Sequence, residues 1–295
     1  MEEFIQYLIS VLSLGSIYAL LALGLVVVFG QLGFLNFAHG DLMTLFGYCL
    51  LFQTGWGVPF WIAVVFSVLF AGLCALAMER IAFRPLRNQS PMTLLITSFA
   101  ISGALHVIFQ ITISPRAQPI PIPEFLSGYM TFGEIFVGRA QIFTIFVAVA
   151  SLMLLNHFLA NSRLGISLRA SAADFDVARV MGIRANRVIA LAFFLSGILA
   201  GIAALLWISQ RGAVHPTLGL TPMIKALIAA IIGGLSSPKG ALYGGFLLGG
   251  LEATMLNLLP DDYVVFRDAG VLLLLVFFLI FRPNGIIATN PEPMR

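Results

Sequence analysis

The sequence predicts an all-α polytopic membrane protein with eight or nine transmembrane segments, some of them broken helices. Three observations support this fold class. Hydrophobic residues make up 60% of the 295 residues and charged residues only 10%, whereas soluble domains are about 45–50% apolar and about 25% charged. The mean hydropathy is +1.01. Long apolar runs recur along the chain, and polar, glycine-containing stretches interrupt two of them.

Nine apolar segments are candidates to cross the membrane. About 20 apolar residues span roughly 30 Å of hydrocarbon. The candidates are residues 4–29, 39–54, 59–79, 92–113, 142–160, 188–209, 223–235, 241–258 and 265–281. The second and seventh are short, so each is interpreted as a half-helix or a re-entrant segment. Residues 1–295 are expected to form a single transmembrane domain.

Basic residues are distributed unevenly among the predicted loops. Those after the third and fifth segments are Arg80, Arg84, Arg87, Arg163, Arg169, Arg179, Arg184 and Arg187. The positive-inside rule places these loops in the cytoplasm. We therefore expect the N-terminus outside and the C-terminus in the cytoplasm, which requires an odd number of crossings. If only eight segments cross, one short segment is wrongly assigned.

The stretch Gly15–Tyr48 contains the clearest break. An apolar helix runs into Asn36, His39, Gly40 and Asp41, and apolar sequence then resumes. Inside a membrane the backbone can leave the helix only where protein or a water-filled cavity surrounds it. The break is therefore a candidate wall of a solute path. His39 either lines that path or caps carbonyl groups freed at the break.

A second break follows a second helix that is rich in small residues. It contains Gly212, His215, Pro216 and Gly219, and a short apolar segment follows it. Paired interrupted segments in two halves of a chain point to a transport site. The predicted translocation path is formed by Asn36, His39, Gly40, His215 and Gly219.

Other polar residues within apolar segments are interpreted structurally. His106 and Gln110 share one helix face, which favours hydrogen bonds between helices over solute contact. Lys225 and Glu252 would be costly in the membrane if unpaired, so we expect an ion pair. Cys49 and Cys74 are expected to be packing residues.

The two longest loops have different character. Residues 114–141 form the predicted periplasmic loop, in which Pro115, Pro119, Pro121 and Pro123 favour extended chain. This loop is either a cap over the outer mouth or an ordinary connector.

Residues 161–187 form the predicted cytoplasmic loop. Ser171 and Asp174 have the spacing of a capping box, which predicts a helix over 172–181 that ends at Gly182. Phe175 and Ala178 would share one face of it, with Met181 following at the same spacing. Because so short a helix is unstable alone in water, it either docks into a partner or lies at the lipid interface as an amphipathic linker.

No nucleotide-binding or hydrolytic motif is found in the sequence. GxxxxGK[ST], HExxH and GxSxG are all absent, so this chain is expected to be non-catalytic and to hold no metal. Carboxylates within the apolar segments are few, which disfavours an ion- or proton-coupled secondary transporter acting alone. A membrane scaffold without transport activity would leave the polar breaks unexplained.

Several stretches resemble the permease subunit of branched-chain (hydrophobic) amino acid ABC importers. The similarity covers nearly the whole chain, and the segment from Asn36 to Gly40 is the most specific part of it. The stretches are Gly15–Leu20, Asn36-Phe37-Ala38-His39-Gly40, Glu79–Arg87, Leu164–Ile183, Ile232–Gly240 and Phe281–Gly285.

The resemblance implies partners and a location. Such permeases assemble with a second related permease subunit, two cytoplasmic ATPase subunits and a periplasmic substrate-binding protein. They lie in the bacterial inner membrane, in contact with lipid, and do not bind nucleic acid. ATP and Mg²⁺ belong to the ATPase subunits, and this chain itself needs no cofactor. Related permeases carry urea or short amides, which remain alternative solutes.

The resemblance also assigns the short cytoplasmic helix as the element that couples to the ATPase. The residues implied in coupling are Ser171, Asp174, Phe175, Ala178, Arg179 and Gly182.

Overall fold

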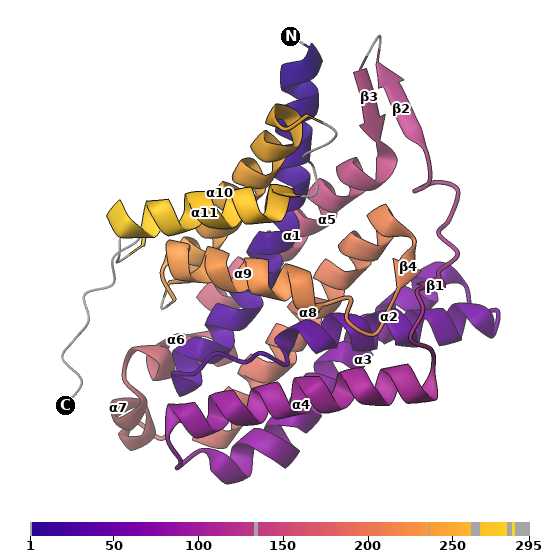
Figure 1. The fold of residues 1–295 in the computed structure, drawn as a ribbon. Helices are drawn as coiled ribbons and strands as arrows, with labels where there is room; N and C mark the ends of the chain where they lie inside the picture. Colours follow the sequence, from indigo (N-terminus) through magenta and orange to yellow (C-terminus); the bar gives the residue numbers. More distant parts are fainter. Residues whose placement is uncertain (1, 133–134, 236, 261–265, 282–284, 287–295) are drawn as a thin grey trace.

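The computed structural model describes residues 2–132, 135–235, 237–260, 266–281 and 285–286 (Figure 1). Within these ranges the chain is mostly helical. The α-helices are α1 Glu2–Leu32, α2 His39–Gly55, α3 Phe60–Met78, α4 Pro91–Thr112, α5 Arg139–Asn161, α6 Arg163–Ala173, α7 Phe175–Val180, α8 Ala185–Arg211, α9 Leu220–Gly233, α10 Pro238–Leu258 and α11 Arg267–Phe281. A π-helical turn, η1 Glu79–Phe83, and a 3-10 turn, η2 Arg84–Leu86, extend α3.

A helix overlaps each of the nine predicted apolar segments, although residue 265 of the last one lies outside the described residues. Five helical stretches are long and apolar enough to cross a membrane by length and composition. They are Phe4–Leu32, Phe60–Leu86, Pro91–Thr112, Arg139–Asn161 and Ala185–Arg211. The second and seventh segments are short, as predicted, with 17 residues in α2 and 14 in α9. These five stretches do not establish the predicted eight or nine crossings.

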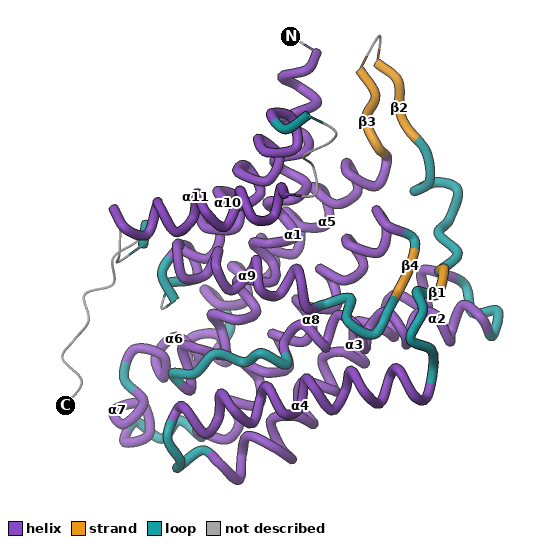
Figure 2. Tube along the Cα trace, viewed as in Figure 1, coloured by secondary structure: helices purple, strands orange, loops and turns teal. Residues whose placement is uncertain are grey.

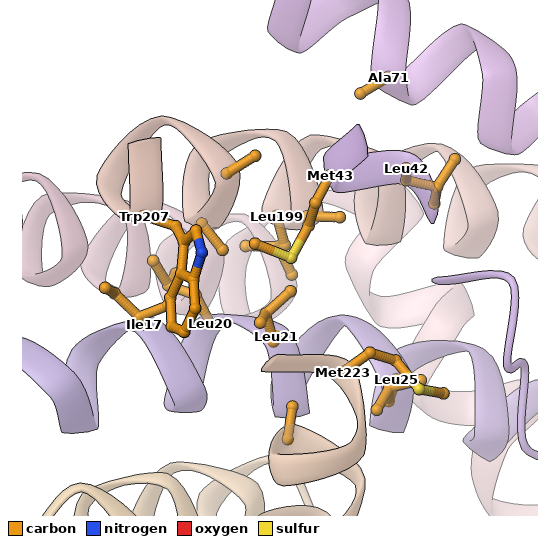
Figure 3. Close-up of a cluster of buried hydrophobic side chains, with 14 of the residues drawn as sticks. Ile17, Leu20, Leu21, Leu25, Leu42, Met43, Ala71, Leu199, Trp207 and Met223 are labelled. Atoms are coloured by element: carbon orange, nitrogen blue, oxygen red, sulfur yellow. The ribbon is translucent and has the colours of Figure 1, made fainter. Parts of the chain in front are cut away.

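Helix α1 lies at the centre of the molecule, between α10 and α9 on one side and α8 on the other (Figure 1). Its residues from Ile17 to Ala22 have no exposed surface. Side chains from α1, α2, α8 and α9 interlock around it, including Leu21, Met43, Leu199 and Met223 (Figure 3). The helix that leads into the first predicted break is therefore the core of the fold.

The outer helices present apolar side chains to the surroundings. Ile111 of α4 is 80% exposed and Phe146 of α5 is 78% exposed. Exposed apolar surface of this extent is unfavourable in water, and it suits helices whose outer faces contact lipid tails.

Each of the two predicted breaks follows a long helix and precedes a short one (Figure 2). Helix α1 ends at Gly33 (φ +65°), whose amide donates to Phe29 O at 2.8 Å. Helix α8 ends at Gly212 (φ +71°), whose amide donates to Ile208 O at 2.7 Å. Both glycines adopt the left-handed conformation that terminates helices. The internal repetition suggested by the sequence therefore has a counterpart in the order and capping of the helices.

Two short antiparallel strand pairs supplement the helical fold. Strand β1 Gln118–Pro119 pairs with β4 Ala213–Val214, and β2 Tyr129–Phe132 pairs with β3 Ile135–Gly138. The chain near the prolines of the long loop is extended, as predicted, and β1 lies against the second break. The fold is thus predominantly, and not purely, α-helical.

Helices α1 and α10 approach so closely that glycine is required at their crossing. A Cβ atom on Gly249 would lie 2.3 Å from Gly15 N, whereas one on Gly250 would meet only Val11 Cγ1, at 3.7 Å. We expect Gly249→Ala to lower the free energy of unfolding by about 1–3 kcal/mol through overpacking. Gly250→Ala should be neutral or slightly stabilising, because alanine favours helix.

Thermal unfolding of the detergent-purified variants measures this difference. Equal unfolding temperatures for the two alanine variants would show that the crossing is looser than the structure indicates.

Candidate transport site

The two breaks meet inside the protein at Gly40 and Gly219. A Cβ atom on Gly40 would lie 2.6 Å from Gly219 O, and one on Gly219 would lie 1.8 Å from Gly40 O. The Gly219 amide also donates to Thr44 Oγ1 at 3.3 Å. The first turns of α2 and α9 are thus in backbone contact. Two stretches about 180 residues apart in sequence, each predicted to contribute to a path, are brought together.

Asn36 builds the turn that starts α2. Its Oδ1 accepts a hydrogen bond from Ala38 N at 3.1 Å, and its carbonyl oxygen accepts from His39 N at 3.2 Å. Asparagine favours such turns because its side chain can replace a backbone partner. Asn36 is 2% exposed, so in this conformation it organises the backbone of the break from within the protein.

His39 links three helices. Its ring has no exposed surface, and its Nδ1 lies 2.9 Å from Ser196 Oγ of α8. A Cβ atom on Gly24 of α1 would lie 2.6 Å from the ring. The imidazole therefore fills the space between α1 and α8 while it belongs to α2. Neither a direct contact with solute nor capping of carbonyls follows from this arrangement.

Asp41 is paired with His106, as the interpretation of His106 as an interhelical residue predicts. The carboxylate Oδ1 lies 2.7 Å from His106 Nε2 of α4, and Asp41 is 1% exposed. A buried carboxylate needs such a partner. The pair fixes α4 to the start of α2.

His215 lies in the second break, immediately after β4. Its Nδ1 is 3.3 Å from Thr217 Oγ1, and its carbonyl oxygen accepts a hydrogen bond from Leu218 N at 3.0 Å. The residue is half-buried. Of the two histidines predicted for the path, it is therefore the more accessible one.

The predicted ion pair between Lys225 and Glu252 is confirmed. Lys225 Nζ lies 2.9 Å from Glu252 Oε1, and Tyr18 OH donates to Glu252 Oε2 at 2.6 Å. Lys225 also reaches Asp268 Oδ1 at 3.0 Å, and Arg267 Nη2 lies 3.5 Å from Glu252 Oε1. The network ties α1, α9, α10 and α11 together, and it extends beyond the two residues that the sequence singled out.

Sequence analysis did not predict a polar cavity that lies at the C-terminal end of α8. It measures about 490 Å³ and lies between the ends of α1, α5 and α8 and the β2–β3 hairpin. Gln210 Nε2 donates to Ser13 Oγ at 3.0 Å and to Thr144 Oγ1 at 2.9 Å there. Arg211 stacks over the Trp207 ring at 3.4 Å. The adjacent polar residues Gln210 and Arg211 at the end of an apolar segment are the sequence feature that could have indicated this cavity.

The predicted cytoplasmic helix is divided differently from expectation. Ser171 does not cap it, because its hydroxyl lies within α6, 2.8 Å from Ser167 O and from Gln31 Oε1. Asp174 is the N-cap, with extended backbone and its carboxylate accepting from Val177 N at 2.9 Å. Gly182 ends the turn at φ +85°, as predicted.

The side chains of this short helix point in two directions. Ala178 is 5% exposed and faces the protein, whereas Arg179 is exposed and Val180 and Met181 are 88% and 78% exposed. The side chain of Phe175 lies outside the described residues. The exposed apolar pair at the end of α7, Val180 and Met181, is thus available to another subunit.

The fold and the site define a polytopic membrane protein whose interior is built on two helix breaks and paired charges. Comparison of the sequence with known families makes this class specific. The chain belongs to the family described as branched-chain amino acid transport system/permease component, whose profile matches residues 7–281.

Characterised relatives cover almost the full chain. It is 34% identical to the high-affinity branched-chain amino acid transport system permease protein BraD of Pseudomonas aeruginosa, over 98% of this chain and 97% of that protein. It is 31% identical to LivH of Escherichia coli, over 98% and 96%. It is 25% identical to a second permease protein of that organism, LivM, over 96% of this chain and 71% of LivM.

A chain in the solved structure of PsaBC from Streptococcus pneumoniae in complex with Fab matches 93% of this chain and 90% of that chain, at 15% identity and a TM-score of 0.48. The family and the apolar helices together indicate a multi-pass protein of the bacterial inner membrane.

The Lys225–Glu252 pair gives a stability prediction. Lys225→Met leaves Glu252 buried without its nearest cation, and breaking a buried pair costs about 3–5 kcal/mol. Part of this loss should be recovered in Lys225→Met/Glu252→Gln, which removes both charges. Thermal unfolding of the purified protein measures both effects.

Lys239→Met is the matched control, because Lys239 is exposed at the start of α10. The single variant Glu252→Gln completes the comparison. If the double variant is destabilised by the sum of Lys225→Met and Glu252→Gln, energetic coupling between Lys225 and Glu252 is ruled out.

Proposed function

We propose that this chain is the transmembrane permease subunit of an ATP-driven importer that moves branched-chain or other hydrophobic amino acids into the cytoplasm by alternating access. The observation that carries this proposal is the family match over residues 7–281, together with the near full-length similarity to BraD and LivH. Because the family and these relatives are described as branched-chain amino acid permeases, leucine, isoleucine and valine are the first candidate solutes. Selection among them is assigned to a periplasmic binding protein.

The proposed topology has the N-terminus outside and the C-terminus in the cytoplasm. Because the termini lie on opposite sides, this topology takes the nine-segment alternative, in which α2 and α9 are the short segments and begin at the centre of the protein. The loops before α4 and before α8 lie in the cytoplasm because they carry the arginine excess. The extended chain around β1 lies at the outer surface.

The proposed path follows the junction between α2 and α9. Asn36, His39, Gly40, His215 and Gly219 surround the place where helical backbone is interrupted, which is where transporters place their sites. Asn36 and His39 are enclosed in the described conformation. Alternating access would open this junction to each side in turn, by sliding α2 against α9.

The proposed assembly contains a second related permease, two cytoplasmic ATPase subunits and a binding protein. LivM, a second permease protein of the organism that has LivH, is a detectable relative of this chain and supports pairing of two related subunits. ATP and Mg²⁺ would be bound by the ATPase subunits, and this chain would contribute no catalysis.

Helix α7 is proposed to receive the movement of the ATPase. A route for that movement exists within the chain, because Gln31 at the end of α1 bonds to α6. Its Nε2 donates to Leu168 O at 2.9 Å, and its Oε1 accepts from Ser171 Oγ at 2.8 Å. Gln31 is two residues from Gly33, where the first break begins. Displacement of α6 and α7 would therefore move the first break through the hydrogen bonds of Gln31.

Uptake by the reconstituted complex tests both the function and the coupling. Proteoliposomes that contain all subunits, with ATP enclosed and the binding protein added outside, should accumulate radiolabelled leucine, because complexes whose ATPase faces the lumen import into it. Without enclosed ATP they should not. Val180→Asp should lower uptake at least about fivefold, since loss of an interface contact costs ~1 kcal/mol or more. ATP hydrolysis should continue.

Val180→Leu is the control and should keep uptake near the wild-type level, because it retains an apolar side chain at an exposed position. Phenylalanine and urea are tested in parallel to define the solute class. Leucine uptake by this chain alone without ATP would contradict the proposal and favour a secondary transporter.

A further inference from the structure

A large cavity at one end of the molecule is lined by arginine. It measures about 990 Å³ and lies between the end of α1, η2, α7 and the start of α8. Five arginines from two separate connecting regions, the one after α3 and the one before and into α8, converge on it: Arg84, Arg87, Arg179, Arg184 and Arg187. The other lining residues are Gln31, Leu32, Asn88, Ala185, Asn186 and Ile189.

The positive charge of this cavity is largely uncompensated by described groups. None of its lining residues is acidic, and Glu79 is the carboxylate that pairs with Arg87. Among the described residues the other four arginines form no ion pair. The positive-inside rule accounts for arginine in cytoplasmic loops, but it does not require arginines of different loops to share one concave site.

The start of α8 adds further donors. Arg184 is the N-cap residue, but no side chain caps the helix there, and no acidic residue occupies its first turn. Ala185 and Asn186, whose backbone amides belong to this turn, line the cavity. Unsatisfied amides at a helix N-terminus, together with the helix dipole, attract anions.

Arg87 shows that the site is organised as well as charged. Its Nη1 donates to Asn186 Oδ1 at 2.7 Å, and its Nη2 binds Glu79. Its Nε is buried and has no hydrogen-bond partner among the described groups. The guanidinium is thus held in a fixed orientation at the cavity wall, with a donor still to be satisfied.

We infer that this cavity binds a phosphate-bearing anion. Guanidinium groups bind phosphate oxygens through paired, charge-assisted hydrogen bonds, and a cavity of this size accepts a whole headgroup. The favoured source is an anionic phospholipid, because basic pockets between membrane helices on the cytoplasmic side recognise such headgroups. Ile81 lies in η1, the turn directly before η2, and is 77% exposed. This apolar side chain is available to contact the acyl chain of a bound lipid. Free phosphate is the other source of the same chemistry.

Native mass spectrometry of the full-length protein, purified with its co-purifying subunits, tests this inference. The probes are phosphatidylglycerol, phosphatidylcholine and inorganic phosphate. The test variant is Arg184→Gln/Arg187→Gln, and both side chains are exposed and unpaired among the described residues. The control is Arg80→Gln/Arg163→Gln, which removes two exposed arginines that do not line the cavity.

We expect the wild-type protein and the control to retain phosphatidylglycerol over phosphatidylcholine. Each arginine near an anionic headgroup contributes ~1 kcal/mol, so the test variant should bind it about 10- to 30-fold more weakly. Saturable phosphate binding with the same dependence on the arginines would support the site with a soluble anion. If the test variant does not fold, Arg84→Gln alone should weaken binding roughly fivefold.

Equal binding of phosphatidylglycerol and phosphatidylcholine by the wild-type protein, unchanged in the folded test variant and with no saturable phosphate binding, would overturn the inference. So would a test variant that keeps anion binding but loses a co-purifying subunit, because the cavity would then dock protein.

Discussion

The contact between Gly40 and Gly219 is the constraint on which the interior depends. A membrane protein can interrupt a helix only where the freed backbone groups are enclosed by protein or reached by water. Here each break is enclosed by the other, because the two short helices begin in backbone contact. A side chain at either glycine would separate the helices and expose the backbone of both breaks to an apolar surrounding.

Polar pairs then hold the helices around that contact. His39 with Ser196 and Asp41 with His106 join helices distant in sequence, and Lys225 with Glu252 joins the consecutive helices α9 and α10. In lipid such groups are costly alone and stabilising in pairs. These pairs also determine which helices pack against one another, because an apolar helix face alone does not specify its partner. Movement of α2 against α9 would therefore have to carry these pairs along or exchange their partners.

Local sequence signals predicted the elements well and their meeting only in part. The positions of the breaks were predicted from their polar and glycine residues, and in the structure Gly33 and Gly212 end the preceding helices in the left-handed conformation. The contact of Gly40 with Gly219 was suggested by the repeated pattern, but no local rule gives a distance between residues so far apart. The cap of α7 was misassigned because Ser171 and Asp174 both have capping side chains. In the structure Gln31 accepts a hydrogen bond from the Ser171 hydroxyl within α6, which leaves Asp174 as the N-cap of α7.

The arginine cavity was also beyond local reasoning. In the sequence each basic loop indicated orientation separately, and their convergence depends on how the ends of α3 and α7 and the start of α8 lie beside one another. The proposed passage lies at the junction of the breaks and changes its access with the state of the ATPase.

Labelling of His215→Cys in the reconstituted complex tests that claim most directly, with Cys49 and Cys74 replaced by alanine. A membrane-impermeant thiol reagent applied from each side should modify the new cysteine from one side without nucleotide and from the other side in the ATP-trapped complex. Reaction from the same side in both states, or from neither, would contradict the account.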